Sequence, residues 1–118
     1  MERRPYVLEA KLHLAGGVDS AAVGAAVTTE LCGHWQHEGG CRWPHNNEIY
    51  DEAENGLATF RTLWVAPEAE EAGVRTRIEK ALNDGAGWSV EATRIRELRP
   101  DETALAVRLA RTPPPLDG

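Results

Sequence analysis

Long apolar runs are missing from this sequence of 118 residues. A membrane-spanning helix needs about 20 consecutive apolar residues, and no stretch comes near that length. The first residues, from Met1 to Pro5, carry charges and no apolar signal-peptide core. We therefore expect a soluble, cytoplasmic protein.

Basic residues are also in short supply, with 13 Lys and Arg against 19 Asp and Glu and a net charge of −6. An acidic chain is repelled by phosphate backbones. The sequence also lacks the clustered basic residues and paired exposed aromatics of an RNA-binding sheet. We expect no nucleic-acid partner, and an RNA-binding sheet is the weakest of the functional hypotheses.

The composition that remains is that of one globular domain. Apolar residues make up 42% of the chain and charged residues 27%, close to the averages for folded proteins. At this length one hydrophobic core can form without cross-links. We expect a single α+β domain over residues 1–111, followed by a Pro-rich tail over residues 112–118.

Periodicity indicates the element order β-α-loop-β-β-α-β-β. Residues Tyr6–Leu14 alternate as a half-buried strand, and Asp19 or Ser20 begins a helix that ends near Cys32. The expected later elements are a hairpin of Glu48–Glu54 and Leu57–Ala66 turned at Asn55-Gly56, a helix from Pro67, a strand Trp88–Leu98 with a bulge near Arg94, and a last strand Leu105–Leu109.

The first six elements match a ferredoxin-like β-α-β-β-α-β antiparallel sheet. To this the sequence adds an extra C-terminal strand and a long Cys/His/Trp loop after the first helix. Both helices would cover one face of the sheet. With nothing long enough left to cover the other face, we expect a homodimer that forms through it.

The long loop concentrates the metal-ligating residues of the chain. Zinc prefers four tetrahedral ligands from Cys sulfur and His nitrogen. Cys32, His37, Cys41 and His45 could supply such a set, with His34 as the alternative fourth ligand. The spacing matches no standard zinc finger, and Gly33, Gly39 and Gly40 would let the backbone turn around an ion.

Other chemistry remains open for the same loop. A Cys32–Cys41 disulfide would suit an oxidising compartment, and free thiols with hydrogen-bonded histidines are a further alternative. A metal site with three protein ligands and a water would be catalytic, with Glu38 or Glu48 as its proton shuttle. Without a metal, Cys41 is the candidate nucleophile, with Arg42 adjacent and His37 and His45 close in sequence.

These patterns lead to two functional hypotheses. The first is a small metal-binding domain, with zinc as its ion, that acts as an accessory or interaction protein. The second is a small enzyme of specialised metabolism, metal-dependent or cofactor-free, with its active site at the Cys32–His45 loop. Its substrate would be a small aromatic or apolar molecule in a pocket lined by four tryptophans: Trp35, Trp43, Trp64 and Trp88.

Overall fold

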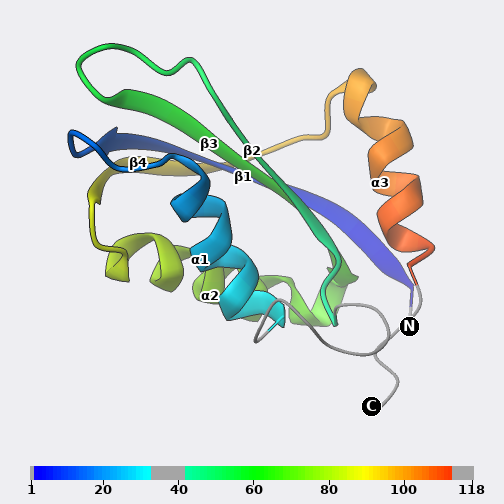
Figure 1. Cartoon of the computed structure of the whole chain (residues 1–118). Helices are drawn as coiled ribbons and strands as arrows, with labels where there is room; N and C mark the ends of the chain where they lie inside the picture. The colour runs from blue at the N-terminus through cyan, green and yellow to red at the C-terminus, as the bar shows by residue number, and fades with distance from the viewer. Residues whose placement is uncertain (1, 33–41, 113–118) are drawn as a thin grey trace.

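The computed structural model describes residues 2–32 and 42–112, which form a four-stranded sheet and three α-helices (Figure 1). The elements in chain order are β1 (Arg3–Leu14), α1 (Ala21–Cys32), β2 (His45–Tyr50), β3 (Leu57–Pro67), η1 (Glu68–Glu70), α2 (Glu71–Asp84), β4 (Trp88–Arg96), η2 (Pro100–Glu102) and α3 (Thr103–Ala110). The α+β class and the ferredoxin-like arrangement are confirmed. None of the helices within the described ranges is long and apolar enough to cross a membrane.

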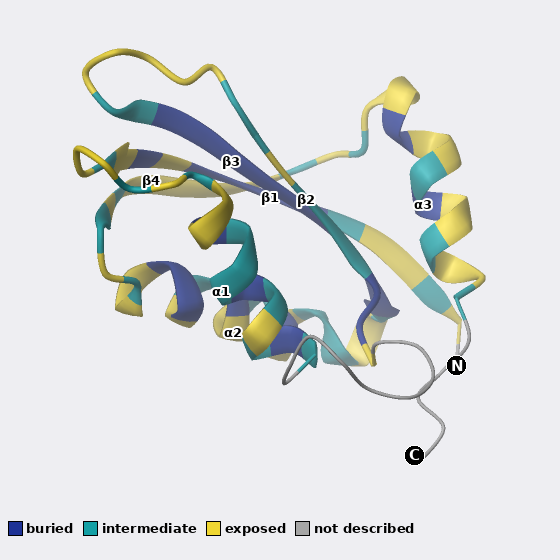
Figure 2. Ribbon diagram, in the orientation of Figure 1, coloured by how far each residue is buried: buried dark blue, intermediate teal, exposed yellow. Residues whose placement is uncertain are grey.

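The sheet has the strand order β2-β3-β1-β4, and every neighbouring pair is antiparallel. Helices α1 and α2 pack on one face of it (Figure 1). Alternate residues of β1 and β3, such as Leu8, Leu12, Phe60 and Trp64, point to these helices and are almost fully buried. The two central strands therefore form the floor of the main core (Figure 2).

Both core helices bury the residues that their spacing predicts. On α1 these are Val23, Val27 and Leu31, at intervals of four residues along one face. The backbone N–H of Ala21 donates to Asp19 Oδ1 over 3.0 Å, so Asp19 caps the start of the helix as expected. On α2 the buried residues are Val74, Ile78, Ala81 and Leu82, whose spacing likewise places them on one face of the helix.

The hairpin of β2 and β3 forms, but its turn is not the expected two-residue one. The paired residues run from His45 opposite Trp64 to Tyr50 opposite Thr59. Among the described non-glycine residues only Asp51 has a positive φ, of 55°, so Asn55 cannot take the left-handed conformation of a type I′ turn. Gly56 instead has a φ of 89° and its N–H donates to the Ala53 carbonyl, which makes a three-residue turn closed by glycine.

The expected last strand, Leu105–Leu109, is wrong: these residues belong to helix α3. Leu105 and Leu109 are also four residues apart, and both pack with Ala106 against Val7 and Leu63 on the second face of the sheet. Their spacing fits a helix as well as a strand. Burial of this helical stripe on the sheet decides for the helix.

Helix α3 also removes the reason for expecting a dimer through the whole second face. It covers the part of that face that includes Val7 and Leu63, and Figure 1 shows it on the opposite side of the sheet from α1 and α2. We refer to the remainder of the second face, which α3 leaves uncovered, as the open face.

The bulge in β4 lies earlier than expected. Lys11 pairs with Ala92 and Leu12 with Val90, so Glu91 is the extra residue and the bulge is three residues before Arg94. Beyond it the strand continues to Arg96, which pairs with Val7. Because of this extra residue, the side-chain alternation of β4 shifts by one position, which places Arg94 and Arg96 on the open face.

Candidate functional site

The residues of the predicted metal site are only partly within the described structure. His34, His37, Glu38 and Cys41 lie outside the described residues, as does Trp35. Cys32 ends α1 and His45 begins β2, and the Cys32 Sγ and His45 Nδ1 atoms are 4.0 Å apart. These two of the predicted ligands are thus neighbours, and the convergence of the whole ligand set stays a prediction.

His45 has hydrogen-bond partners on both ring nitrogens. Nε2 lies 3.0 Å from Thr28 Oγ1, and Nδ1 lies 3.1 Å from the Trp43 carbonyl oxygen. Burial lowers the pKa of His45 below its usual value, although the carbonyl contact acts in the opposite direction. This imidazole is a structural bridge between α1 and β2 in the arrangement seen.

Cys32 is disulfide-bonded. A metal is bound by the thiolate form of cysteine, so ligation by Cys32 would first require reduction. Within residues 2–32 and 42–112, no three His, Cys, Asp or Glu side chains gather around a point that could hold a metal ion.

Glu48, the second candidate proton shuttle, lies away from this segment. Because side chains alternate along β2, His45 and Asn47 face the helices, where Asn47 donates to the Gly24 carbonyl. Glu48 faces the other way and its carboxylate binds Arg61 at 2.6 Å. A shared site of Glu48 and His45 is therefore not formed across the sheet.

The three described tryptophans belong to the core on the helix side. Trp43 and Trp64 are members of the main cluster and Trp88 packs against it. The Trp88 indole N–H donates to the Leu82 carbonyl, and that of Trp43 to Glu70. These side chains fill the interior and do not line a pocket on the open face.

The open face instead carries a row of charges that alternates in sign across all four strands. The strand register places Glu48 on β2 opposite Arg61 on β3, Arg61 opposite Glu9 on β1, and Glu9 opposite Arg94 on β4. Opposite charges on facing positions of neighbouring strands attract each other. The row connects the four strands on the face opposite α1 and α2, beside the part that α3 covers.

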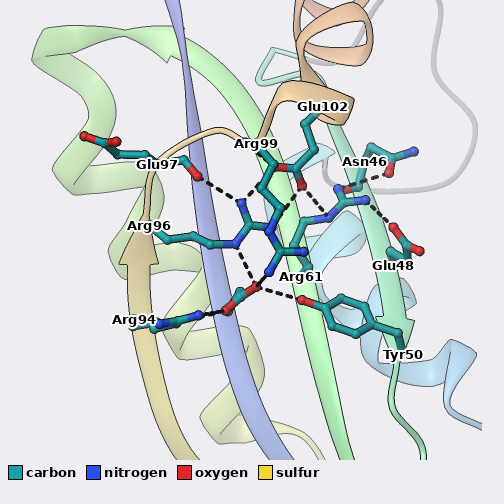
Figure 3. Close-up of polar contacts among 10 residues, drawn as sticks. Asn46, Glu48, Tyr50, Arg61, Arg94, Arg96, Glu97, Arg99 and Glu102 are labelled. Atoms are coloured by element: carbon teal, nitrogen blue, oxygen red, sulfur yellow. Dashed lines mark hydrogen bonds and ion pairs between the residues drawn. The ribbon is translucent and has the colours of Figure 1, made fainter.

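Glu9 is the centre of the resulting network, and its partners Tyr50, Arg94 and Arg96 are labelled in Figure 3. It is 6% exposed and accepts hydrogen bonds from the Tyr50 hydroxyl at 2.7 Å, Arg96 Nε at 2.7 Å and Arg94 Nε at 2.9 Å. Burial alone would raise its pKa, but these donors lower the pKa of Glu9 to about 2. Glu9 is therefore an anion at neutral pH. Burial, followed by the hydrogen bond to Glu9, raises the pKa of Tyr50, although Arg96 and Arg99 act in the opposite direction.

A second buried carboxylate extends the network to α3. Glu102 immediately precedes α3 and is 7% exposed. Its carboxylate accepts hydrogen bonds from both terminal nitrogens of Arg96, at 2.8 and 3.0 Å. Arg61 Nε lies 3.5 Å from the same carboxylate. The hydrogen bonds from Arg96 lower the pKa of Glu102 to about 2 against the opposing effect of burial. A bidentate pair of this kind fixes the direction of both side chains.

Beside the network the open face is hollowed. A cavity of about 400 Å³ is bordered by three basic side chains, Lys11, Arg94 and Arg99, and by Tyr50, Asp51 and Glu9. A second cavity of about 360 Å³ lies between β2 and α3 and shares Tyr50 and Arg99 with the first. We call the first cavity the β1–β4 hollow; its volume is in the range of small-molecule sites.

The cations around the β1–β4 hollow are not fully neutralised. Lys11 Nζ donates to the Thr59 hydroxyl at 3.1 Å and makes no ion pair with any described residue. Arg99 reaches Glu9 only at 3.5 Å, and the Arg94 and Arg99 side chains are 67% and 51% exposed. Each therefore retains N–H groups that face solvent.

The sequence contained a signal for this site that its interpretation missed. Glu9 and Lys11 are polar residues of the strand expected over Tyr6–Leu14, and Arg61 is a charged residue of the strand expected over Leu57–Ala66. Strand alternation places all three on one face, and only the pairing register shows that they are adjacent.

Comparison with known proteins concerns the fold alone. No family model matches the sequence, and no curated protein is significantly similar to it. Among solved structures, an amidase of the hydantoinase/carbamoylase family from Burkholderia phymatum matches with a TM-score of 0.50 and 9% identity, over 82% of this chain and 29% of that one. A formyltetrahydrofolate deformylase from Pseudomonas putida KT2440 matches with a TM-score of 0.47 and 15% identity, over 80% of this chain and 29% of that one. The chain thus spans less than a third of either protein, and at 9% identity the likeness to the amidase shows an arrangement of strands and helices and nothing about activity.

Proposed function

We propose that this domain is a small-molecule-binding module that holds an anionic ligand in the β1–β4 hollow. The observation that carries the proposal is Lys11, an exposed cation that lines the 400 Å³ cavity and has no carboxylate bound to it among the described residues. The chain as a whole is acidic, with a net charge of −6. An unneutralised cation in a cavity of such a protein favours an anion from solution.

The neighbouring charges support the same ligand. In the network, Glu9, Glu48 and Glu102 face four arginines, and Lys11 adds a further cation. The acids of the network are already bound by arginine or tyrosine, whereas Lys11 and Arg99 retain unused N–H donors. Carboxylates and phosphates form their strongest hydrogen bonds with such charged donors.

Calorimetric titration with succinate and with inorganic phosphate tests this function. We expect binding that weakens as salt is added, and about a tenfold loss of affinity in Lys11→Met, the effect of losing one charge-assisted hydrogen bond. Lys80→Met is the matched control, because Lys80 is an exposed lysine on α2 that pairs with Asp84. The proposal fails if neither anion binds, or if the two variants bind alike.

The metal site remains a second candidate, favoured by the 4.0 Å separation of Cys32 Sγ and His45 Nδ1. In this proposal the reduced chain binds zinc through Cys32, His45, Cys41 and one of His34 or His37. Elemental analysis of the reduced protein should then give one zinc per chain, and less in Cys32→Ser. His13→Gln is the control, since His13 lies on the other face of β1 from the core. A reduced protein without zinc would rule the site out.

The homodimer and the cytoplasmic location also remain proposals. A dimer would have to form through the open face or through a free edge of the sheet. Light scattering would detect it. A disulfide at Cys32 would suit an oxidising compartment and thus favours a location other than the cytoplasm.

A further inference from the structure

We propose that the ligand of the β1–β4 hollow is a small carboxylate that also carries a hydrogen-bond donor, as hydroxy acids and amino acids do. This inference rests on the proposed function and names its ligand class. The observation behind it is Asp51, an acidic residue that borders the same cavity as Lys11, Arg94 and Arg99.

The hollow provides donors from three of its bordering residues. Lys11 is at the middle of β1, Arg94 is on β4, and Arg99 lies between β4 and α3. Their remaining N–H groups can surround one anionic group. The carboxylate of the ligand is therefore assigned to Lys11, Arg94 and Arg99.

Asp51 gives the hollow an acceptor that the protein itself does not use. It follows the last residue of β2 and is exposed, and its carboxylate has no hydrogen bond or ion pair with any residue in the described ranges. By contrast, the Tyr50 hydroxyl already donates to Glu9, and the Thr59 hydroxyl already accepts from Lys11. A hydroxyl or ammonium group of the ligand is therefore assigned to Asp51.

The conformation of Asp51 is consistent with a positioned side chain. Its φ of 55° is in the left-handed region, which is unfavourable for most residues with a Cβ but accessible to Asp and Asn. Strained residues of this kind are concentrated at ligand sites. The same property makes Asp51→Asn a conservative test variant, because Asn can keep this backbone conformation.

An unpaired carboxylate also selects among anions by repulsion. A ligand with only acidic groups would bring a like charge towards Asp51, whereas a ligand with a donor would form a hydrogen bond there. Specificity then comes from an attractive and a repulsive element together. Malate and aspartate should bind better than succinate, and lactate and alanine better than propionate.

Calorimetry with these two matched sets tests the inference. In the wild-type protein we expect malate and aspartate to bind at least about tenfold more tightly than succinate, the range for a hydrogen bond to a charged group. Asp51→Asn should reduce that preference to less than about threefold. The variant lacks the negative charge that attracts a hydrogen-bond donor and repels a second carboxylate. Asp84→Asn, at the end of α2 on the helix side of the sheet, should leave the preference unchanged.

The outcomes separate this inference from the proposed function. Equal binding of succinate, malate and aspartate to the wild-type protein overturns the ligand class but leaves an anion site. A preference that survives in Asp51→Asn overturns the role of Asp51. If none of the six compounds binds, the proposed function itself fails.

Discussion

Replacing Glu9 by Gln should destabilise the domain far more than the same change at Glu48, the exposed acid of the same row of charges. The substitution keeps the shape of the side chain but removes its charge, and it places an amide group among the Tyr50, Arg94 and Arg96 donors. Glu9 is 6% exposed, so water cannot replace the lost acceptor. Removing one partner of a buried ion pair costs about 3–5 kcal/mol.

For Glu9→Gln we expect the lower end of this range, a loss of about 3 kcal/mol. Arg94 and Arg99 are more than half exposed and can be solvated in the variant, so the charge of Arg96 accounts for most of the loss. We expect a decrease of about 3 kcal/mol in the free energy of unfolding, or roughly 10–15 °C in Tm for a domain of this size. Glu48→Gln is the matched control: Glu48 lies in the same row of charges but its side chain is 58% exposed, so its loss should cost less than about 1 kcal/mol.

The pH dependence gives an independent check of the same reasoning. The pKa values of Glu9 and Glu102 are lowered to about 2 in the folded state, against about 4.3 for an unperturbed glutamate. Both groups therefore contribute stability that is fully present above about pH 4.3 and is lost as the pH falls towards 2. Glu9→Gln should reduce this acid-dependent loss, and Glu48→Gln should not.

Urea unfolding of the three proteins at pH 7, and at intervals from pH 4.5 to 2.5, measures both effects. The reasoning is refuted if the two variants have the same stability at pH 7. It is also refuted if the difference between wild type and Glu9→Gln does not shrink in acid.

Three further predictions concern other parts of the fold. Gly56→Ala should destabilise the domain by more than about 1 kcal/mol in urea unfolding, because Gly56 has a φ of 89° and an added Cβ would collide with the Leu14 carbonyl; a neutral effect would contradict the turn described. The imidazole of His45 should titrate by NMR below about pH 6.5, since burial lowers its pKa, and a midpoint above that value would mean that the ring is not buried. Ala106→Asp should expose the second face by displacing α3, because Ala106 is 5% exposed against Val7 and Leu63; faster hydrogen exchange at Val7 and Leu63 is expected, and unchanged exchange would show that α3 does not protect them.

The sequence predicted most of the sheet and both core helices because their patterns agree with local propensity. The period-two alternation of β1 and the four-residue spacing of Val23, Val27 and Leu31 each had one interpretation. The C-terminal segment did not, because Leu105, Val107 and Leu109 alternate as in a strand, whereas Leu105 and Leu109 are also four residues apart as on one face of a helix; in α3, Val107 is 44% exposed. A helix start was nonetheless visible in Pro100-Asp101-Glu102, with proline at the first position and acidic residues in the first turn.

The candidate site was less predictable because it depends on pairing between distant strands. Glu9, Arg61 and Arg94 are separated by more than 30 residues along the chain, and no local pattern connects them. The Cys/His concentration was more conspicuous. Cys32 and His45 lie near each other, and the metal site as a whole stays a prediction. Its thiolate chemistry could not be judged, since the sequence does not show whether a cysteine is oxidised.

The central claim, that the open face is the ligand site, is tested most directly by NMR mapping with malate. The account predicts saturable shifts of the backbone amides of Lys11, Tyr50, Asp51 and Arg99 that diminish with added salt, with little change in α1. Shifts that instead concentrate at Val23, Val27 and His45, or no shifts at millimolar malate, would contradict it.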